Sequence, residues 1–312
     1  MNPKYILFAL LIGAMVMSCS KEPEGDQEMN VTSIDFSKYS SEKPDQPLHL
    51  LFIHHSCGGQ LFADKGDVAG NNCINPSHPN GGGLRSLLEE NNYIVHEASY
   101  GSVIGAETDI CHWNTKFRDH MDKILTCKHQ DEFFTDGKEN NIIMFKSCFP
   151  NSWIESDGTE PGDPDSCEHT IANYKASYNA LLKYFSRQTD TLFVVVTAPP
   201  LVQPSKIKSI IKTLLGRSKG SSIDVAGQRI RYFNNWLKDI EKGWLKGYKY
   251  HNVVVFDYYD ILTDKGKSNW SMYGSGGGSD SHPSSVGNSK AAKEFILFLN
   301  QAVNRKLKHI PE

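Results

Sequence analysis

The chain has 312 residues, of which 39% are hydrophobic and 22% are charged, and its formal net charge is -3 at pH 7. This balance is typical of a globular protein and excludes a chain that is disordered throughout. The charges are spread without a dominant basic block, so we expect no nucleic acid as a partner.

The first 19 residues have the pattern of an export signal. Lys4 supplies a positive charge, and the apolar stretch from Tyr5 to Val16 is short for a membrane span. The sequence Val16-Met17-Ser18-Cys19 resembles the lipobox of bacterial lipoproteins, which implies cleavage before Cys19 and attachment of lipid to its thiol. An ordinary secretory signal with a chance cysteine is the alternative.

Residues 20–45 are polar, acidic and poor in apolar side chains, which predicts a flexible tether. The acidic residues after Cys19 resemble the export signals of surface lipoproteins in Bacteroidetes. We therefore expect a protein of the bacterial cell envelope that is lipid-anchored at the outer membrane, on its periplasmic or its outer face. Residues 46–308 form the predicted folded domain, which is long enough for one sizeable core.

Short apolar runs alternate with segments of helical periodicity along this domain. The runs predict strands at 48–53, 93–98, 141–146, 191–197 and 252–256. The periodic segments predict helices near 84–90, 115–125, 171–187, 223–240 and 289–306. A Gly- and Asn-rich loop is expected at 63–83. This alternation indicates a mostly parallel sheet that helices cover on both faces.

The segment 201–221 carries basic residues among Ile and Leu. It fits a mobile amphipathic lid over a pocket, or a solvated surface helix, and we favour the surface helix.

Polar side chains follow the first strand at the point where it ends. His54, His55, Ser56 and Cys57 come directly after Ile53, and a glycine pair then breaks the strand. Ligands bind at the carboxyl ends of strands in open α/β sheets, which favours a functional site here. A plain turn, in which Ser56 satisfies backbone groups, is the alternative.

A second polar segment, the Gly-rich loop 274–284, lies before the last helix and contains Asp280 and His282. A serine hydroxyl needs a general base within hydrogen-bond reach in order to attack a carbonyl carbon, and the base needs an orienting carboxylate. His282 and Asp280 can supply these groups to Ser56. The turns after the second and third strands offer Gly101 and Asn151 as donors for the developing oxyanion, together with the N–H of Ser56.

These motifs resemble the SGNH (GDSL-type) hydrolase family in their order along the whole domain. Ser56 matches the family's nucleophile, Gly101 its oxyanion-hole glycine, Asn151 its oxyanion-hole asparagine and His282 its late histidine. The resemblance implies a three-layer sandwich with a flavodoxin-like, five-stranded parallel sheet and helices on both faces. The family's members are esterases and lipases that act on acyl groups.

The chain departs from the family pattern in several places. His54-His55 replaces the residues that usually precede the nucleophile, and Asn151 stands in an unusual Phe-Pro-Asn-Ser context. Asp280 lies two residues before His282, where the family's acid lies three before its histidine. A backbone carbonyl that orients His282 therefore remains an alternative, and Gly105 is a rival for the glycine role.

The resemblance implies an exported serine esterase whose substrate is an acylated carbohydrate or another small ester. Members of the family remove acetyl groups from polysaccharides, and we favour a sugar O-acyl group over a lipid. A non-catalytic glycan-binding lipoprotein on a decayed hydrolase fold is the alternative. In that case exposed aromatic side chains would bind sugar rings, with candidates Trp113, Trp153, Trp270 and Tyr273.

Seven cysteines occur, and six remain when Cys19 is set aside, an even number that suggests disulfides in an exported protein. Their spacing leaves the pairing open. In a flavodoxin-like strand order the first and third strands are neighbours, so Cys57 and Cys148 are candidates for a bridge. No CxxC pair occurs, and His54 and His55 should point to opposite faces, so we expect no metal site and no cofactor.

Overall fold

The apolar runs form the centre of a seven-stranded sheet in the computed structural model, which describes residues 31–204 and 223–308. Across the sheet the order is β10-β9-β8-β1-β5-β6-β7. The strands are β1 (Leu48–Ile53), β5 (Tyr93–Ala98), β6 (Cys127–His129), β7 (Glu132–Phe133), β8 (Ile142–Lys146), β9 (Leu192–Val196) and β10 (Val253–Phe256). Neighbouring strands run parallel except β7, which is antiparallel to β6.

The mostly parallel α/β sheet is confirmed, but the prediction of five strands is wrong. The five central strands have the flavodoxin-like order, with β1 between β5 and β8. The two additional strands, β6 and β7, form a short hairpin at one edge of the sheet. Their sequence from Cys127 to Phe133 is mostly polar and carries no apolar run, so periodicity could not reveal them.

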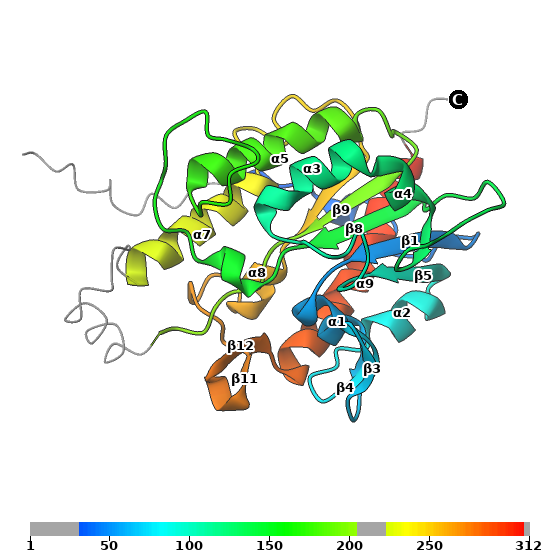
Figure 1. Ribbon diagram of the computed structural model, residues 1–312, viewed down its shortest axis with the longest axis horizontal. Helices are drawn as coiled ribbons and strands as arrows, with labels where there is room; N and C mark the ends of the chain where they lie inside the picture. Colours follow the sequence, from blue (N-terminus) through cyan, green and yellow to red (C-terminus); the bar gives the residue numbers. More distant parts are fainter. Residues whose placement is uncertain (1–30, 205–222, 309–312) are drawn as a thin grey trace, which may run out of the picture. The chain divides into compact units, whose positions relative to one another are not determined.

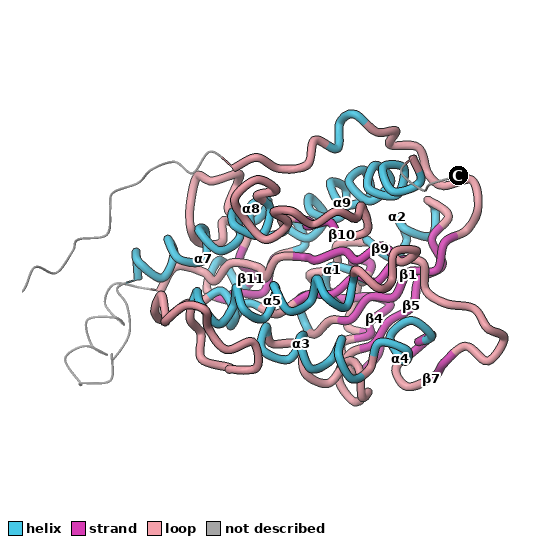
Figure 2. Tube along the Cα trace, turned by 90° about the horizontal axis from the view of Figure 1, so that it is seen from above, coloured by secondary structure: helices cyan, strands magenta, loops and turns pink. Residues whose placement is uncertain are grey.

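Helices cover both faces of the sheet, as predicted (Figure 1). One face packs against α3 (Ile110–Asp119), α4 (Met121–Thr126), α5 (Ile171–Phe185) and α7 (Ile223–Lys238). The other face packs against α1 (Ser56–Phe62), α2 (Leu84–Glu90), α8 (Tyr258–Leu262) and α9 (Ser285–Leu307). Figure 2 shows α9 and α8 on one side of the strands and α3 and α4 on the other.

The core is divided by the alternation of side chains along each strand. In β1, Leu51 and Ile53 pack into the layer with α3 and α5, while Leu50 and Phe52 pack into the layer with α9. All four side chains are fully buried. Because both faces are covered, β1 reads as a continuous apolar run rather than as an alternating one.

Smaller elements fill segments for which the sequence predicted loops. The region after α1 contains a three-stranded sheet in the order β2-β4-β3, with β2 (Asp64–Lys65), β3 (Ala69–Asn71) and β4 (Ile74–His78). The Gly-rich loop before α9 is a hairpin of β11 (Gly274–Ser275) and β12 (Asp280–Pro283), which are joined by η3 (Gly276–Gly278). Two more 3₁₀ turns are η1 (Phe36–Lys38) and η2 (Phe149–Ser152).

The helix predicted at 115–125 is two helices, α3 and α4, which meet at His120. The first of them begins at Ile110, five residues before its predicted start. The N–H of Ile110 donates a 2.9 Å hydrogen bond to Oδ1 of Asn151. The partner that stabilises this helix start therefore lies far away in the sequence, and local patterns cannot show it.

The compact unit that contains the sheet includes residues from Val31 on, ahead of the domain boundary predicted at residue 46. Phe36 packs edge-on against Phe298 of α9, with 4.9 Å between the ring centroids. Asn300 and Asn304 of α9 donate hydrogen bonds to backbone carbonyls of residues 40–42. Residues 31–45 are therefore part of the fold, because α9 supplies partners for their polar backbone.

No helix within residues 31–204 and 223–308 is long and apolar enough to cross a membrane. The predicted signal with Cys19, and most of the segment 201–221, lie outside the described residues.

We expect the fold to lose stability as the pH falls from about 6.5 to about 4, in part through His96 of β5. Its Nε2 lies 2.9 Å from Nδ1 of His49, and burial, followed by the charge of His49, lowers the pKa of His96 to about 4. Between these pH values the unfolded chain binds the proton more readily than the folded chain, so acid favours unfolding. The contribution is at most about 3 kcal/mol.

Denaturant unfolding at pH 7 and pH 4.5 measures this effect. His96→Gln should unfold with a weaker pH dependence than the wild-type chain over this range. An equal loss of stability in both proteins would show that His96 does not contribute.

Candidate active site

The candidate nucleophile lies where β1 meets α1, at the carboxyl end of the sheet. Ile53 is the last residue of β1, and Ser56 is the first residue of α1, with His55 at the N-cap position. The N–H of His54 donates to the carbonyl of Ala98, so the end of β1 is held against β5. Ser56 itself is partly exposed. The fold therefore presents this hydroxyl at the edge where α/β proteins bind ligands.

The glycine pair after the cysteine lies inside α1, whereas the sequence suggested that it ends the strand. A Cβ atom on Gly58 would lie 2.4 Å from Cβ of His54, and one on Gly59 would lie 1.9 Å from the carbonyl oxygen of Cys73. Any larger residue at either position would push α1 away from its neighbours. The two glycines thus allow the helix that carries Ser56 to pack closely on the end of β1.

Ser56, His282 and Asp280 form a hydrogen-bonded chain in the structure. The Ser56 Oγ lies 3.2 Å from Nε2 of His282, although the two residues are 226 positions apart in the sequence. On its other side the His282 ring places Nδ1 2.9 Å from Oδ1 of Asp280. With the proton on Nδ1, the ring donates to the carboxylate and Nε2 accepts from the serine hydroxyl.

The two-residue spacing between Asp280 and His282 is accommodated by a local turn. Oδ1 of Asp280 also accepts the backbone N–H of His282 at 3.0 Å, and Oδ2 accepts the hydroxyl of Ser275 at 3.1 Å. The carboxylate thus folds back over its own chain and reaches both N–H groups of the histidine. This geometry removes the need for a backbone carbonyl to orient the ring.

The surroundings favour the charged form of Asp280. Burial alone would raise the pKa of its carboxyl, but the hydrogen bonds from the backbone and ring of His282 outweigh this effect and lower the pKa. The His282 ring also packs against Phe149 in a T-shaped arrangement, at 4.9 Å between centroids and an interplanar angle of 80°. A carboxylate and an aromatic ring therefore hold the imidazole from two sides.

His54 lies under the site in a buried polar chain. Its Nε2 is 2.8 Å from Oε1 of Glu97, and Arg85 forms an ion pair with the other carboxylate oxygen. Burial would raise the pKa of Glu97, but the hydrogen bond from His54 and the charges of His54 and Arg85 lower it. The carboxylate is therefore compensated inside the protein, and the two ring nitrogens of His54 contact Glu97 and the carbonyl of His55.

His55 points to a different neighbour. Its Nε2 donates to the carbonyl of Gly105 at 2.7 Å, and its ring stacks on Tyr100 with 3.7 Å between centroids. Burial is the main cause that lowers the pKa of His55, which favours the neutral ring. The two adjacent histidines thus contact separate parts of the site and do not converge on one point.

The two candidate glycines differ in what their N–H groups do. The N–H of Gly105 donates to Oγ of Ser102 at 2.8 Å, so that donor is already used. Gly101 lies in the turn after β5 with φ +88°, and a Cβ there would lie 3.2 Å from the amide nitrogen of Asn72. The geometry disfavours Gly105 as an oxyanion donor, and the role of Gly101 stays a prediction.

Asn151 has a structural function that the sequence did not reveal. Its side chain is buried, and Nδ2 donates to Asp109 at 2.7 Å and to the carbonyl of Cys148 at 3.4 Å. Its Oδ1 accepts the N–H of Ile110 and so caps the start of α3. In this arrangement the amide is turned toward α3, and its role as an oxyanion donor stays a prediction.

The predicted bridge between Cys57 and Cys148 is wrong, because both residues are free cysteines in the structure. The strands that precede them are neighbours, as expected. The two thiols lie close enough for a hydrogen bond from Cys57 to Cys148. The Cys148 sulfur also lies near Ser56, with 3.7 Å between Sγ and Oγ.

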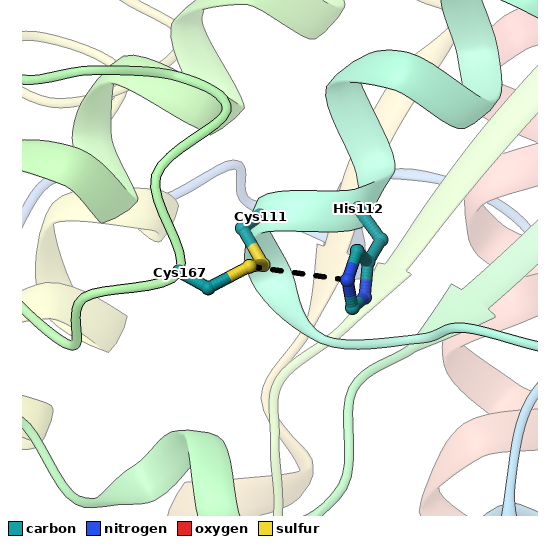
Figure 3. A group of neighbouring side chains, drawn as sticks. All are labelled: Cys111, His112 and Cys167. Atoms are coloured by element: carbon teal, nitrogen blue, oxygen red, sulfur yellow. Dashed lines mark hydrogen bonds between the residues drawn. A yellow bond between two sulfur atoms is a disulfide. The ribbon is translucent and has the colours of Figure 1, made fainter.

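The disulfide in the structure joins Cys111 of α3 to Cys167, across 56 residues (Figure 3). It ties the loop before α5 to the start of α3. The ring of His112 lies beside it, with Nε2 3.8 Å from Sγ of Cys167. Cys111, His112 and Cys167 are close enough to hold a metal ion, but the bonded sulfur atoms are not thiolate ligands.

A cavity of about 620 Å³ lies between the loop before α2 and the first turns of α9. Ser285, three residues after His282, contributes to its lining, but Ser56 and His282 do not. Three lysines contribute to its wall: Lys65, Lys290 and Lys293. Lys290 is already paired with Asp264, at 3.1 Å.

Three residues lie at the site in roles that sequence reasoning missed. Phe149 packs on His282, Cys148 lies beside Ser56, and Lys146 lies behind Cys148, with 3.7 Å between Nζ and Sγ. A usable signal was present in one case. Lys146 is a charged residue at the end of a buried strand. A buried charged residue indicates a functional site more often than a charged residue on the surface does.

The sequence matches no family profile and no curated protein. Among solved structures, the chain is similar to a carbohydrate esterase family 2 enzyme with a carbohydrate-binding domain from Corynascus thermopiles (Myceliophthora fergusii). The identity is 11%, the match covers 85% of this chain and 68% of that chain, and the TM-score is 0.39. A second solved structure matches at 12% identity over 87% of this chain and 99% of that chain, with a TM-score of 0.35. At these scores the likeness carries no argument about activity.

Proposed function

We propose that the chain is an exported serine esterase of the SGNH type that removes O-acyl groups, such as acetyl, from carbohydrate. The observation that carries the proposal is the chain of hydrogen bonds from Ser56 through His282 to Asp280. These residues come from two distant segments, and the fold brings them together at the carboxyl end of β1. Ester hydrolysis by a serine nucleophile needs these three groups in this order.

In the proposed reaction, Oγ of Ser56 attacks the ester carbonyl while Nε2 of His282 takes its proton. The tetrahedral intermediate collapses to an acyl-serine, and His282 returns the proton to the leaving alcohol. Water then attacks the acyl-serine by the same route and releases the acid. Asp280 stabilises the imidazolium that forms in each half of the reaction, because its carboxylate accepts from Nδ1.

The proposed oxyanion donors are the N–H groups of Ser56 and Gly101 and the side-chain amide of Asn151. The amide of Asn151 hydrogen-bonds to Asp109 in the structure, so it must turn when substrate binds. Asp109 is exposed, and water can hydrate its carboxylate after this exchange. The proposal therefore includes a local rearrangement at the start of α3.

The substrate class rests on the family resemblance and on the expected location outside the cell. The acyl group is proposed to be small.

Two measurements test the proposal directly. The purified full chain should hydrolyse a small chromogenic acetyl ester and release acetate from an acetylated polysaccharide. An organophosphonate should label Ser56, and a peptide map should find the label on that residue. A folded protein that neither hydrolyses any acyl ester nor takes the label would overturn the proposal.

A non-catalytic glycan-binding protein is the competing proposal, and the aromatic candidates bear on it. Trp113 lies in the core, and Trp270 is 7% exposed. Trp153 and Tyr273 are partly exposed. With two of the four rings buried, the aromatic surface available to a sugar is small, and the hydrogen-bonded triad favours catalysis. Glycan binding without any turnover would favour the competing proposal.

The proposed anchor gives a further prediction. The mature chain should begin at Cys19 and partition with membranes, since lipid on its thiol would replace a spanning helix. Cys19→Ala should release the protein or block its processing, as fractionation and N-terminal mass analysis can show. Normal membrane retention of this variant would count against the lipobox.

A further inference from the structure

Lys146, the last residue of β8, is a buried cation with an unusual partner. It is 1% exposed, and its Nζ donates to the carbonyl of Ser147 at 3.1 Å and to Sγ of Cys148 at 3.7 Å. Within residues 31–204 and 223–308, no carboxylate forms a salt bridge with it. A buried ammonium group is costly unless an opposite charge compensates it. The Cys148 sulfur is the group in place to carry that charge.

Cys148 has a second thiol beside it. Cys57 is completely buried in the first turn of α1 and hydrogen-bonds to Cys148. That hydrogen bond, followed by the charge of Lys146, lowers the pKa of Cys148 against the opposing effect of burial. Burial is the main cause that raises the pKa of Cys57, which favours its protonated form. The two directions favour a negative charge on Cys148 rather than on Cys57.

We propose that Cys148 is a thiolate paired with Lys146 and is the residue of this chain that hydroperoxides oxidise, with Cys57 as the thiol that then closes a disulfide. Reactive thiols of this kind lie beside a cation and next to a second cysteine. Cys148 is partly exposed, so a small oxidant can reach it beside Ser56. The modification is independent of whether Ser56 is catalytic.

The chemistry proceeds in two balanced steps. The Cys148 thiolate attacks one peroxide oxygen, the O–O bond breaks, and hydroxide or alkoxide leaves and takes up a proton. The sulfur is oxidised to a sulfenic acid and the peroxide is reduced. Cys57 then loses its proton and attacks this sulfur, the S–O bond breaks, and the departing hydroxide leaves as water with that proton.

The bridge would link the first turn of α1 to the end of β8. Oxidation would remove the negative sulfur that lies 3.7 Å from the Ser56 hydroxyl, and it would leave Lys146 without its counter-ion. If the proposed esterase activity is present, oxidation should change it reversibly. That consequence rests on the proposed function, whereas the modification itself does not.

The test uses the full chain with its Cys111–Cys167 bridge intact, treated with hydrogen peroxide and mapped without reduction. We expect one new link, between Cys57 and Cys148. Cys57→Ser should stop at the sulfenic acid of Cys148, which a dimedone-type reagent traps, and Cys148→Ser should give neither product. Cys73→Ser is the matched control, because Cys73 is a half-buried free thiol nearby, and it should leave the new link unchanged.

The role of Lys146 is measured by the rate at which iodoacetamide alkylates Cys148 at pH 7. Lys146→Met should slow this rate by about tenfold for each unit by which the thiol pKa rises, and Lys146→Arg should retain it. If Lys146→Met does not fold, the alkylation rates of Cys148 and Cys73 are compared in the wild-type chain. Cys148 should then react faster than Cys73. Equal alkylation rates for Cys148 and Cys73 would overturn the proposal. A Cys73–Cys148 link after oxidation would also overturn it, as would a Cys57–Cys148 bridge already present in the purified protein.

Discussion

Ser56→Ala should abolish nearly all esterase activity, with a loss in kcat on the order of 10⁴–10⁶. The substitution removes the oxygen that lies 3.2 Å from Nε2 of His282 and with it the covalent route. Initial rates on a chromogenic acetyl ester measure the effect. The variant should also lose labelling by an organophosphonate.

Folding of this variant is the necessary control. The Ser56 hydroxyl contacts His282 and Cys148, which are both partly exposed, so its removal should change the melting temperature little. Ser102→Ala is a matched serine variant on a neighbouring turn, which removes a hydroxyl that accepts from Gly105 and donates to Ser99. Wild-type activity in a folded Ser56→Ala protein would exclude the proposed mechanism.

Asp280→Asn should reduce kcat by a factor on the order of 10²–10³. The amide keeps the size of the side chain but does not stabilise the imidazolium, and it can hold His282 in the wrong tautomer. A buried triad aspartate contributes more to kcat. The Asp280 side chain is 49% exposed, so water screens part of its charge. Steady-state kinetics should show the loss mainly in kcat.

Ser275→Ala is the matched control for this variant. It removes the 3.1 Å hydrogen bond to Asp280 and leaves the contact between Asp280 and His282 in place, so its effect should be within a few fold. An Asp280→Asn protein with nearly wild-type kcat would show that another group orients His282. That result would restore the backbone-carbonyl alternative and leave the role of Ser56 untouched.

Local sequence patterns were sufficient for the layers of the fold. β5 spans the residues of its predicted strand, and β8, β9 and β10 lie within theirs, because strands buried on both faces need continuous apolar runs. The edge hairpin of β6 and β7 and the small sheet of β2, β3 and β4 were not predicted. Their strands are short and mostly polar, so their sequences carry no hydrophobic period.

For the site, the sequence by itself determined which side chains follow strand ends, and this was enough to select Ser56, Asp280 and His282. Only the tertiary structure decided their contacts, such as the turn that lets Asp280 reach His282 across a two-residue spacing. In the tertiary structure the Asn151 side chain contacts the start of α3. Cys57 and Cys148 are free thiols, and Cys111 pairs with Cys167. The physical reason is that a hydrogen bond or a disulfide depends on distance and direction in space, and separations of 56 or 226 residues along the chain carry neither.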